Sequence, residues 1–319
     1  MKYYAGNNGV KLLKSMMGPE FDNNVYLHKF PSGEEYCQYK ESLRGEDIFI
    51  IQSTSSPAND SLMQLLVMVD AARRASAGTI TAVIPYMGYS RQERKEKSRV
   101  PISAKLVMDL LEASGVNRIV AMDLHTPQIG GFTNLPLDHL TFQPILCDYI
   151  TNKYCETNDI VVVSPDVGAV KRGEQLAERL KCDFGFISKK RTGDSTVELN
   201  HFVGDVTNKT AIIFDDLTES CGTLVQAANA CKENGAKKVV CAVTHFCITD
   251  IGMSRLIENM PHPNINGTPS IDEFIHSDTV DVWWNKKYKP NNIVELSVSD
   301  LILKACNNIH ENKSLATFF

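Results

Sequence analysis

Residues 212–223 constrain the fold of this chain more than any other stretch. An apolar run ends in the adjacent acids Asp215 and Asp216, a short hydroxyl-rich loop follows, and Gly222 opens an amphipathic segment. A short apolar run that leads through turn residues into helical periodicity is typical of a βα unit. The stretch therefore predicts a buried parallel strand whose carboxyl end presents both acids, followed by a tight turn onto a helix.

The chemistry of this stretch indicates a phosphorylated sugar. The first N–H groups of a helix and the positive end of its dipole favour a phosphate. Two carboxylates beside such a phosphate site would accept hydrogen bonds from vicinal hydroxyls. Acids often follow buried strands for structural reasons alone, but here the apolar run, the spacing and the loop agree. Cys221, inside the loop, is interpreted as a spacer although a helix start favours a reactive thiol.

Short apolar runs alternate with stretches of helical periodicity along the whole chain, as in βαβ units. The expected strands cover residues 48–51, 81–84, 119–122, 160–163, 184–187, 211–214 and 238–244. The expected helices cover residues 62–72, 103–114, 169–180, 222–234 and 299–310. We predict an α/β fold in two domains, 1–145 and 146–319, each with a mainly parallel sheet. The helix at 299–310 is a candidate to pack on the N-terminal domain.

The composition favours a cytoplasmic protein that binds neither nucleic acid nor membranes. The 319 residues are 43% apolar, enough for substantial cores, and carry a net charge of -5. The N-terminal residues lack the apolar core of a signal peptide, and apolar runs stay well below the roughly 20 residues that span a bilayer. Nine cysteines without Cys-x-x-Cys spacing are typical of free thiols in a reducing compartment.

The polar clusters of the chain follow expected strands. They cover residues 86–99, 123–128, 164–168 and 215–223. Ligands of open α/β sheets bind beyond the carboxyl ends of the strands, which predicts one site fed by both halves. The cluster at 86–99 is rich in arginine and lysine; taken alone it is a solvated charge run, but its place after a strand favours a shaped, phosphate-binding loop. Within it, Arg91 and Gln92 could frame a purine, whereas a Walker-type phosphate loop is absent.

Two further clusters suit phosphoryl transfer. His125 and Asp166 each follow an expected strand, and together with nucleotide oxygens they could hold Mg²⁺. Residues 188–195 are basic and polar and contain a glycine; this is the profile of either an exposed hairpin or a loop that closes over a site. In a closing loop, Lys189 and Arg191 would meet the charge of a transition state.

The chain resembles the ribose-phosphate pyrophosphokinases, which make phosphoribosyl pyrophosphate (PRPP). Residues 212–223 alone also resemble the type I phosphoribosyltransferases. The wider resemblance covers nearly the whole chain in the family's order and is carried by residues 29–34, 85–95, 99–107, 122–132, 163–170 and 308–319. It implies two phosphoribosyltransferase-like domains and an enzyme that transfers the βγ-pyrophosphoryl group of MgATP to ribose 5-phosphate, giving PRPP and AMP.

The resemblance also implies roles for individual residues. The family's ATP-binding positions match Phe30, Ser32 and Glu34, which reach in from a neighbouring subunit, and Arg91, Gln92, Glu96 and His125. Its metal pair matches His125 and Asp166, and its catalytic loop matches Lys189 and Arg191. Its ribose 5-phosphate site matches Asp215, Asp216, Glu219, Ser220, Cys221, Gly222 and Thr223. A second anion site, where relatives bind activating inorganic phosphate or inhibitory ADP, matches Ser42, Arg44, Arg99 and Ser314. The implied assembly is a homo-oligomer, a hexamer built from dimers.

The chain departs from the family's pattern at several positions. Glu96 and Glu219 replace aspartates, and Ser220 replaces a threonine. Phe246 replaces a glycine, Ala316 replaces a serine of the second anion site, and residues 250–279 differ widely. Two alternatives therefore stay open: a catalytically silent regulatory homologue, which the intact Lys189 and Arg191 disfavour, and a PRPP-consuming phosphoribosyltransferase, which the N-terminal half disfavours.

Overall fold

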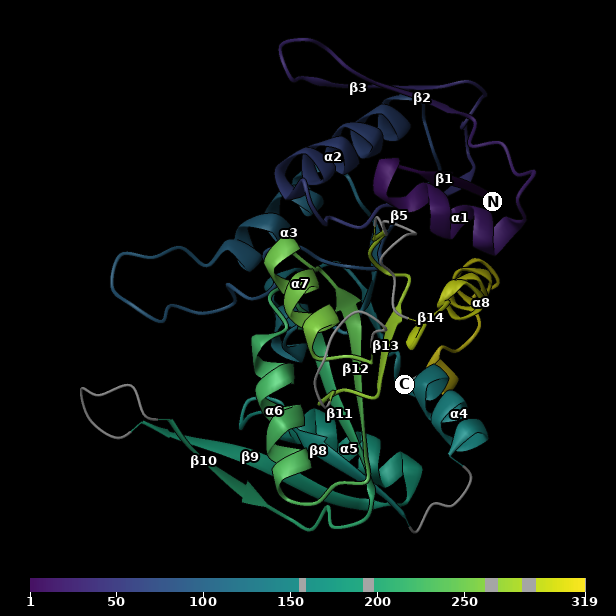
Figure 1. The fold of residues 1–319 in the computed structure, drawn as a ribbon. Coiled ribbons are helices and arrows are strands. Elements are labelled where there is room, and N and C mark those ends of the chain that lie inside the picture. Colours follow the sequence, from purple (N-terminus) through teal and green to yellow (C-terminus); the bar gives the residue numbers. More distant parts are fainter. Residues whose placement is uncertain (155–158, 192–197, 262–268, 283–290, 319) are drawn as a thin grey trace. The chain divides into compact units, whose positions relative to one another are not determined.

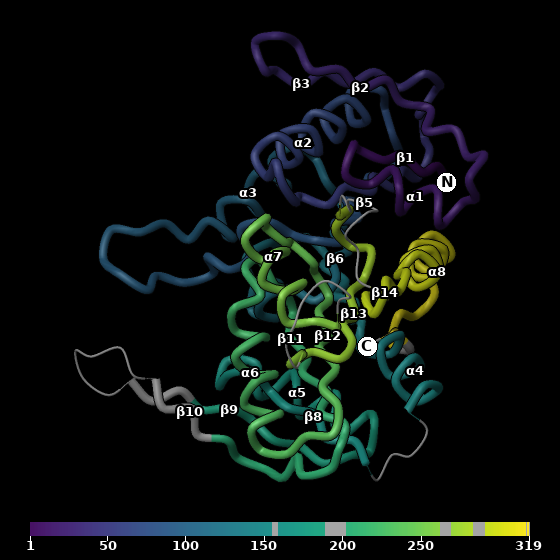
Figure 2. Tube along the Cα trace, viewed as in Figure 1, coloured from purple at the N-terminus to yellow at the C-terminus, as the bar shows by residue number. Residues whose placement is uncertain are grey.

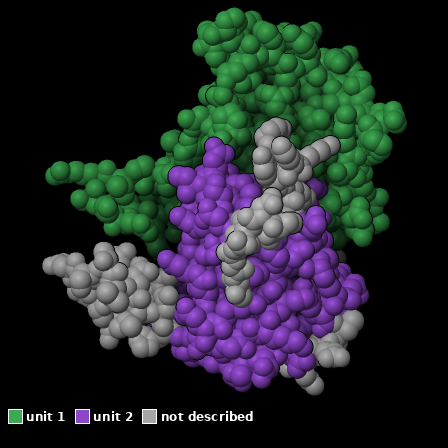
Figure 3. Space-filling model, in the orientation of Figure 1, with its two compact units in different colours: residues 1–142, 279–281, 297–319 green, residues 143–278, 282–296 purple. Residues whose placement is uncertain are grey.

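The computed structural model describes residues 1–154, 159–191, 198–261, 269–282 and 291–318. The chain divides into two compact units, shown in different colours in Figure 3. Unit 1 contains residues 1–142, 279–281 and 297–319, and unit 2 contains residues 143–278 and 282–296. The first unit thus ends three residues before the expected boundary at 145 and also takes the closing segment of the chain.

Unit 1 is built on a five-stranded parallel sheet in the order β1-β4-β5-β6-β7. Its strands are β1 (Lys2–Ala5), β4 (Asp47–Ile51), β5 (Thr79–Ile84), β6 (Arg118–Met122) and β7 (Leu137–Leu140). Its helices are α1 (Val10–Met17), α2 (Ala58–Arg74), α3 (Ser103–Ser114) and α8 (Ser299–His310). The central strands are continuous runs of buried residues, as parallel strands covered on both faces require.

A separate antiparallel hairpin belongs to unit 1. It consists of β2 (Val25–Lys29) and β3 (Glu35–Tyr39), paired from Val25 with Tyr39 to Lys29 with Glu35. One face of the hairpin packs against α2, where the Tyr39 hydroxyl donates to the Met68 carbonyl at 3.0 Å. The hairpin was not predicted, because its strands, VYLHK and EYCQY, mix polar with apolar residues and contain no continuous apolar run.

The closing helix is confirmed with the expected bounds, Ser299–His310, and it belongs to unit 1. It packs against α1. The Tyr3 hydroxyl donates to Asn307 Oδ1 at 3.2 Å, and His310 Nδ1 lies 2.7 Å from Asp47 Oδ2. The closing helix is therefore tied to β1 and to the start of β4.

Unit 2 is built on a seven-stranded sheet in the order β10-β9-β8-β11-β12-β13-β14, which is parallel except for the β9–β10 pair (Figure 1). Its strands are β8 (Ile160–Ser164), β9 (Asp183–Arg191), β10 (Glu198–Val203), β11 (Thr210–Thr218), β12 (Lys238–Phe246), β13 (Glu273–Ser277) and β14 (Ile293–Leu296). Its helices are α4 (Gln143–Lys153), α5 (Val170–Leu180), α6 (Gly222–Glu233) and α7 (Asp250–Glu258). The prediction of mainly parallel sheets flanked by helices is confirmed for both units.

The strand β11 of unit 2 is longer than the sequence suggested. We expected β11 to end at Phe214, but it pairs with β12 as far as Thr218, opposite Phe246. Asp215 and Asp216 therefore lie inside the strand and not beyond it. The apolar pattern stops at the acids, whereas the ladder of backbone hydrogen bonds continues past them.

Within the part of the chain that the structure describes, no helix has the length and apolar character needed to cross a membrane.

Candidate active site

Asp215 and Asp216 are held by an arginine from another element of unit 2. Arg172 lies in the first turn of α5, and its Nη1 donates to Asp215 Oδ1 at 2.9 Å and to Asp216 Oδ1 at 3.2 Å. The Asp216 N–H also donates to Asp215 Oδ1 at 2.9 Å. The Asp216 side chain is 5% exposed and that of Arg172 is 20% exposed. A single cation thus fixes both carboxylates near the carboxyl end of β11.

The surroundings of Asp215 disfavour the ionised form of its carboxyl group. Burial, followed by the like charge of Asp216, raises the pKa of the Asp215 carboxyl well above its usual range. The Arg172 guanidinium opposes this rise in pKa, and the carboxylate of Asp166 adds a smaller repulsion. Arg172 is therefore the group that favours the ionised pair, the form that accepts hydrogen bonds from a diol.

The residues after β11 form a tight turn onto α6, which we call the sugar-phosphate loop (residues 219–223). Glu219 and Ser220 are exposed, whereas Cys221 is buried with a left-handed backbone, φ 55°. The Cys221 N–H donates to Thr218 Oγ1 at 3.1 Å. Burial raises the pKa of the Cys221 thiol to about 11, although a helix start lowers thiol pKa values in general. The thiol is protonated at neutral pH, in line with the interpretation of Cys221 as a spacer.

Asp166 follows β8 in the same unit and caps the entry to α5. Its Oδ1 accepts a hydrogen bond from the Ala169 N–H at 3.0 Å, and its carbonyl accepts from the Ser164 hydroxyl at 2.8 Å. The same short segment therefore orients Asp166 and starts the helix that carries Arg172.

In unit 1, the turn after β6 carries His125. Asp123 has φ 35° and accepts the Phe142 N–H on Oδ2 at 3.0 Å, so this acid supports the turn. The Leu124 N–H donates to His139 Nε2 at 2.8 Å, so this nitrogen of the His139 ring is the acceptor. His125 itself is half-buried. Sequence reasoning identified His125 but not His139, since a histidine in a short edge strand has no distinguishing pattern.

The basic cluster at 86–99 is buried or half-buried over residues 86–90 and mostly exposed from residue 91 onward, and Gln92 is one of its anchors. Gln92 Oε1 accepts the Ser103 hydroxyl at 2.6 Å, and the Ala104 N–H donates to the Gln92 carbonyl at 3.3 Å. These bonds fasten Gln92 to the start of α3. Arg91 and Arg99 are exposed, and Glu96 is paired with Arg94 at 3.1 Å. The cluster therefore has a fixed conformation up to Gln92, and most of the residues after it are exposed to solvent.

The β2–β3 hairpin carries the three residues assigned to a neighbouring subunit's ATP site. Two backbone hydrogen bonds close its turn. The Phe30 N–H donates to the Glu34 carbonyl at 2.9 Å, and the Gly33 N–H donates to the Phe30 carbonyl at 2.8 Å. Ser32 Oγ donates to Glu34 Oε2 at 2.6 Å. The Phe30 ring is 44% exposed. All three side chains are thus presented on the outside of unit 1.

The residues of the expected second anion site lie on exposed segments of unit 1. Ser42 and Arg44 follow β3, and the Arg44 N–H donates to Ser42 Oγ at 3.4 Å. Ser314 follows α8, and its Oγ accepts the Ala316 N–H at 3.1 Å. The Ser314 hydroxyl thus already supports the turn in which Ala316 lies.

The two residues assigned to catalysis sit at the end of β9. The backbones of Lys189 and Arg191 pair with Asn200 and Glu198 of β10. The described part of β9 pairs with β8, and Figure 2 shows the two strands side by side. The side chains of Lys189 and Arg191, and residues 192–197 of the connecting segment, lie outside the described part of the structure.

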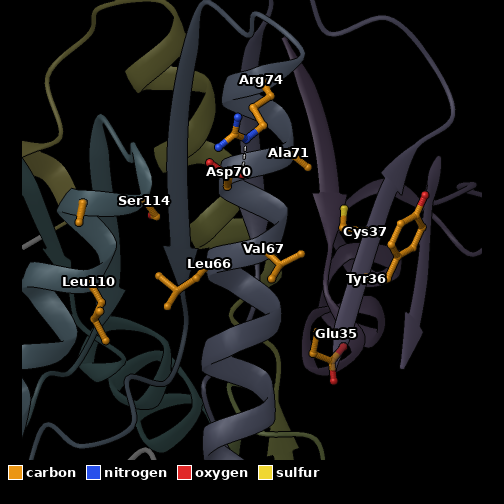
Figure 4. Close-up of a pocket in the computed structure, with 11 residues that line it drawn as sticks. Glu35, Tyr36, Cys37, Leu66, Val67, Asp70, Ala71, Arg74, Leu110 and Ser114 are labelled. Carbon is orange, nitrogen blue, oxygen red and sulfur yellow. Dashed lines mark hydrogen bonds and ion pairs between the residues drawn. The ribbon is translucent and has the colours of Figure 1, made fainter. Parts of the chain in front are cut away.

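A separate cavity of about 530 Å³ lies in unit 1 between β3, α2 and α3 (Figure 4). Most of its lining is aliphatic or aromatic, including Tyr36, Leu66 and Leu110, and it contains none of the predicted site residues. Arg74, which is part of the lining, is paired with Asp70 at 2.6 Å. This cavity is not the site that the sequence predicted.

The comparisons with known proteins agree over the whole chain. Residues 15–115 match the N-terminal domain of ribose phosphate pyrophosphokinase, and residues 145–256 match the phosphoribosyl transferase domain. The ribose-phosphate pyrophosphokinase of Bacillus caldolyticus is 43% identical over 322 residues, which cover 100% of this chain and 98% of that protein. That of Bacillus subtilis is 43% identical over 330 residues and 100% of both chains. A crystal structure of phosphoribosylpyrophosphate synthetase from Mycobacterium smegmatis superimposes with a TM-score of 0.87 at 36% identity, covering 97% of this chain and 98% of that one.

The fold and these matches define a two-domain α/β protein of the phosphoribosyltransferase type. The chain belongs to the ribose-phosphate pyrophosphokinase family of enzymes.

Proposed function

We propose that the protein transfers the βγ-pyrophosphoryl group of MgATP to the C1 hydroxyl of ribose 5-phosphate, giving PRPP and AMP for nucleotide biosynthesis. The observation that carries the proposal is the Arg172-bound pair Asp215 and Asp216, which lies two residues before the sugar-phosphate loop. Membership of the family over the full chain supports it.

In this reaction unit 2 binds the sugar. Asp215 and Asp216 accept hydrogen bonds from the ribose hydroxyls, and the sugar-phosphate loop with the start of α6 binds the 5-phosphate. Fixing the sugar at both ends aims its C1 oxygen at the β-phosphorus, and such positioning is a major part of phosphoryl-transfer catalysis. The new bond joins the C1 oxygen to the β-phosphorus, the bond from the β-phosphorus to the bridging α–β oxygen breaks, AMP leaves, and the hydroxyl proton passes to solvent.

The nucleotide is assigned to residues of unit 1. Arg91, Gln92, Glu96 and His125 contact ATP, and Phe30, Ser32 and Glu34 contribute from a neighbouring subunit. The exposed Phe30 ring supports a role outside its own unit. Lys189 and Arg191 supply positive charge where negative charge builds up on the transferring phosphates.

Asp166 and His125 would hold Mg²⁺ together with the phosphate oxygens of ATP. No group of three or more histidines, cysteines and acids suited to a metal occurs among the described residues. A small protein contribution fits Mg²⁺, which keeps waters and takes substrate phosphates as ligands. When bound, Mg²⁺ supplies neutralisation of the triphosphate charge.

We further propose a homo-oligomer, a hexamer built from dimers, with a second anion site at Ser42, Arg44, Arg99 and Ser314 for activating phosphate and inhibitory ADP. A cytoplasmic setting is proposed because the cysteines that the structure describes are free thiols.

The test of the reaction is product analysis. Protein, ATP, Mg²⁺ and ribose 5-phosphate are incubated together, and AMP and PRPP are expected only when all are present. Release of ADP would show ordinary γ-phosphoryl transfer and would overturn the proposal. Consumption of PRPP with a nucleobase, without formation of AMP from ATP, would show a phosphoribosyltransferase instead.

A further inference from the structure

The sugar-phosphate loop is held in place by contacts with α7 and with Thr249, the residue before this helix. The Glu219 carbonyl accepts hydrogen bonds from the Thr249 N–H at 2.9 Å and from Thr249 Oγ1 at 3.0 Å. The next carbonyl, that of Ser220, accepts from Arg255 Nη1 at 2.7 Å. Two consecutive carbonyls of the loop therefore point towards the start and the face of α7.

This arrangement fixes the direction of the loop's N–H groups. In a trans peptide the C=O and the following N–H point in opposite directions. With the carbonyls of Glu219 and Ser220 turned to α7, the N–H groups of Ser220 and Cys221 point away from that helix. The Cys221 N–H indeed meets Thr218 Oγ1 on the inner side, at 3.1 Å. The contacts with α7 thus set the orientation of both amides; because the Cys221 N–H already meets Thr218, the Ser220 N–H is the one that can be offered to a phosphate.

Close packing at Gly252 maintains the same contact. A Cβ at this position would lie 2.1 Å from the Glu219 carbonyl oxygen and 2.6 Å from Ile248 Cδ1. A side chain at residue 252 would therefore push α7 away from the loop. Thr249 caps α7 by accepting the Gly252 N–H at 3.2 Å, so one residue starts the helix and binds the loop.

Arg255 also brings positive charge to the start of α6. Its Nη1 lies 3.0 Å from the position that a Cβ on Gly222 would take, so the guanidinium lies against the first residue of that helix. A cation and the positive end of a helix dipole at one place favour an anion there.

We propose that α7 is the outer clamp of the sugar-phosphate loop and that Arg255 is its positioning residue. Thr249 holds the Glu219 carbonyl, which turns the Ser220 N–H towards the side where the 5-phosphate would bind. Arg255 holds the Ser220 carbonyl, which keeps the Cys221 N–H on Thr218 and so fixes the turn onto α6, and Arg255 adds positive charge beside Gly222. This inference rests on the proposed function, since it takes the 5-phosphate of ribose 5-phosphate as the anion bound.

The test compares Arg255→Met, Arg255→Lys and Gly252→Ala with Ser254→Ala, an exposed position on the same helix. Calorimetry measures the Kd for ribose 5-phosphate, and steady-state kinetics give kcat and KM for both substrates. We expect Arg255→Met to raise the Kd and KM for ribose 5-phosphate about tenfold, the lower end for a lost charge-assisted hydrogen bond. The KM of Arg255→Met for ATP should stay within about twofold of the parent value. Arg255→Lys should recover most of the affinity for ribose 5-phosphate, and Ser254→Ala should match the parent in all these constants.

Gly252→Ala should weaken ribose 5-phosphate binding at least as much as Arg255→Met, by displacing the helix. An unchanged Kd in Arg255→Met, or an equal loss of ATP and ribose 5-phosphate affinity, would overturn the clamp. The parent protein separates this inference from the function on which it rests. If it forms no AMP from ATP and ribose 5-phosphate, the proposed reaction fails, whereas the calorimetric comparison still decides the role of Arg255.

Discussion

Arg172 and Asp215 come from different elements, α5 and β11, yet Arg172 Nη1 lies 2.9 Å from Asp215 Oδ1. The same nitrogen lies 3.2 Å from Asp216 Oδ1. Since Asp215 carries a raised pKa for reasons of burial and like charge, the arginine favours the ionised form that a sugar hydroxyl needs. The helix that follows β8 is thereby coupled to the two acids inside β11.

The first prediction is a shift in pH dependence when this cation is removed. In the parent, the KM for ribose 5-phosphate should fall as pH rises through the pKa of Asp215, because deprotonation creates the acceptor. Arg172→Met removes the group that lowers this pKa, so the KM for ribose 5-phosphate should fall only at higher pH. At acidic pH the variant should bind ribose 5-phosphate most weakly. KM measured across the pH range checks this, with Arg172→Lys as the charge-retaining control. A profile that keeps its midpoint in Arg172→Met would contradict the prediction.

Asp216→Asn should weaken ribose 5-phosphate binding and leave ATP binding largely intact, because the acid is assigned to the sugar. A hydrogen bond to a charged group contributes about 1.5–3 kcal/mol, so a rise in Kd of roughly ten- to a hundredfold is expected. Titration of each ligand against the variant by calorimetry makes the comparison. Selective loss of ATP affinity would show that the two ligands had been assigned to the wrong halves.

Lys189→Ala and Arg191→Ala should each lower kcat by about a hundredfold or more, with smaller changes in ribose 5-phosphate affinity. The reason is that cations beside the transferring group act mainly when charge builds up in the transition state. Lys237→Ala, which removes an exposed charge elsewhere in unit 2, serves as the matched control. Near-normal kcat in both variants would favour the alternative of an exposed hairpin without a catalytic role.

The sequence predicted the central strands and several helices well, because burial dictates their pattern. α3 has the expected bounds, Ser103–Ser114, and ends at Gly115, whose φ of 110° suits a glycine after a helix. The strand β11 was predicted too short, since its apolar pattern stops at Asp215 while pairing with β12 continues. β13 and the helix α7 fall in residues 250–279, to which no structure had been assigned.

The acid pair and the sugar-phosphate loop were also predictable, because a strand, two acids and a helix start are contiguous in the chain. Arg172 and Arg255 were not. Each acts on residues more than 30 positions away, and an arginine on a helix carries no pattern that distinguishes a long-range partner from solvent. The packing of α5 against the sheet and of α7 against α6 decides the roles of these two arginines.

Phe246→Ala should lower the free energy of unfolding by about 3–5 kcal/mol. Phe246, at the position where the resemblance implies a glycine, is fully buried at the end of β12. Its ring lies 4.9 Å from that of Phe274 and 4.7 Å from that of His276. Truncation would leave a cavity inside this aromatic cluster. Denaturant unfolding measures the loss, with the exposed Ile251→Ala as control. A change below about 1 kcal/mol would mean that the cluster repacks.

The last prediction concerns the second anion site. Ala316 replaces a serine of the family's pattern, and its N–H donates to Ser314 Oγ at 3.1 Å, so a hydroxyl at 316 would lie in the same turn as that of Ser314. A hydrogen bond to a charged phosphate contributes about 1.5–3 kcal/mol, or roughly ten- to a hundredfold in affinity. Arg44 and Arg99 supply more of the attraction than one hydroxyl, so we expect phosphate activation to persist at higher phosphate concentrations. Activity is measured against phosphate concentration, and Ala316→Ser should shift the half-activating concentration down by about tenfold. Equal dependence in both proteins would show that position 316 contributes nothing to the effector, and independence of phosphate in both would show that the second site does not operate in this chain.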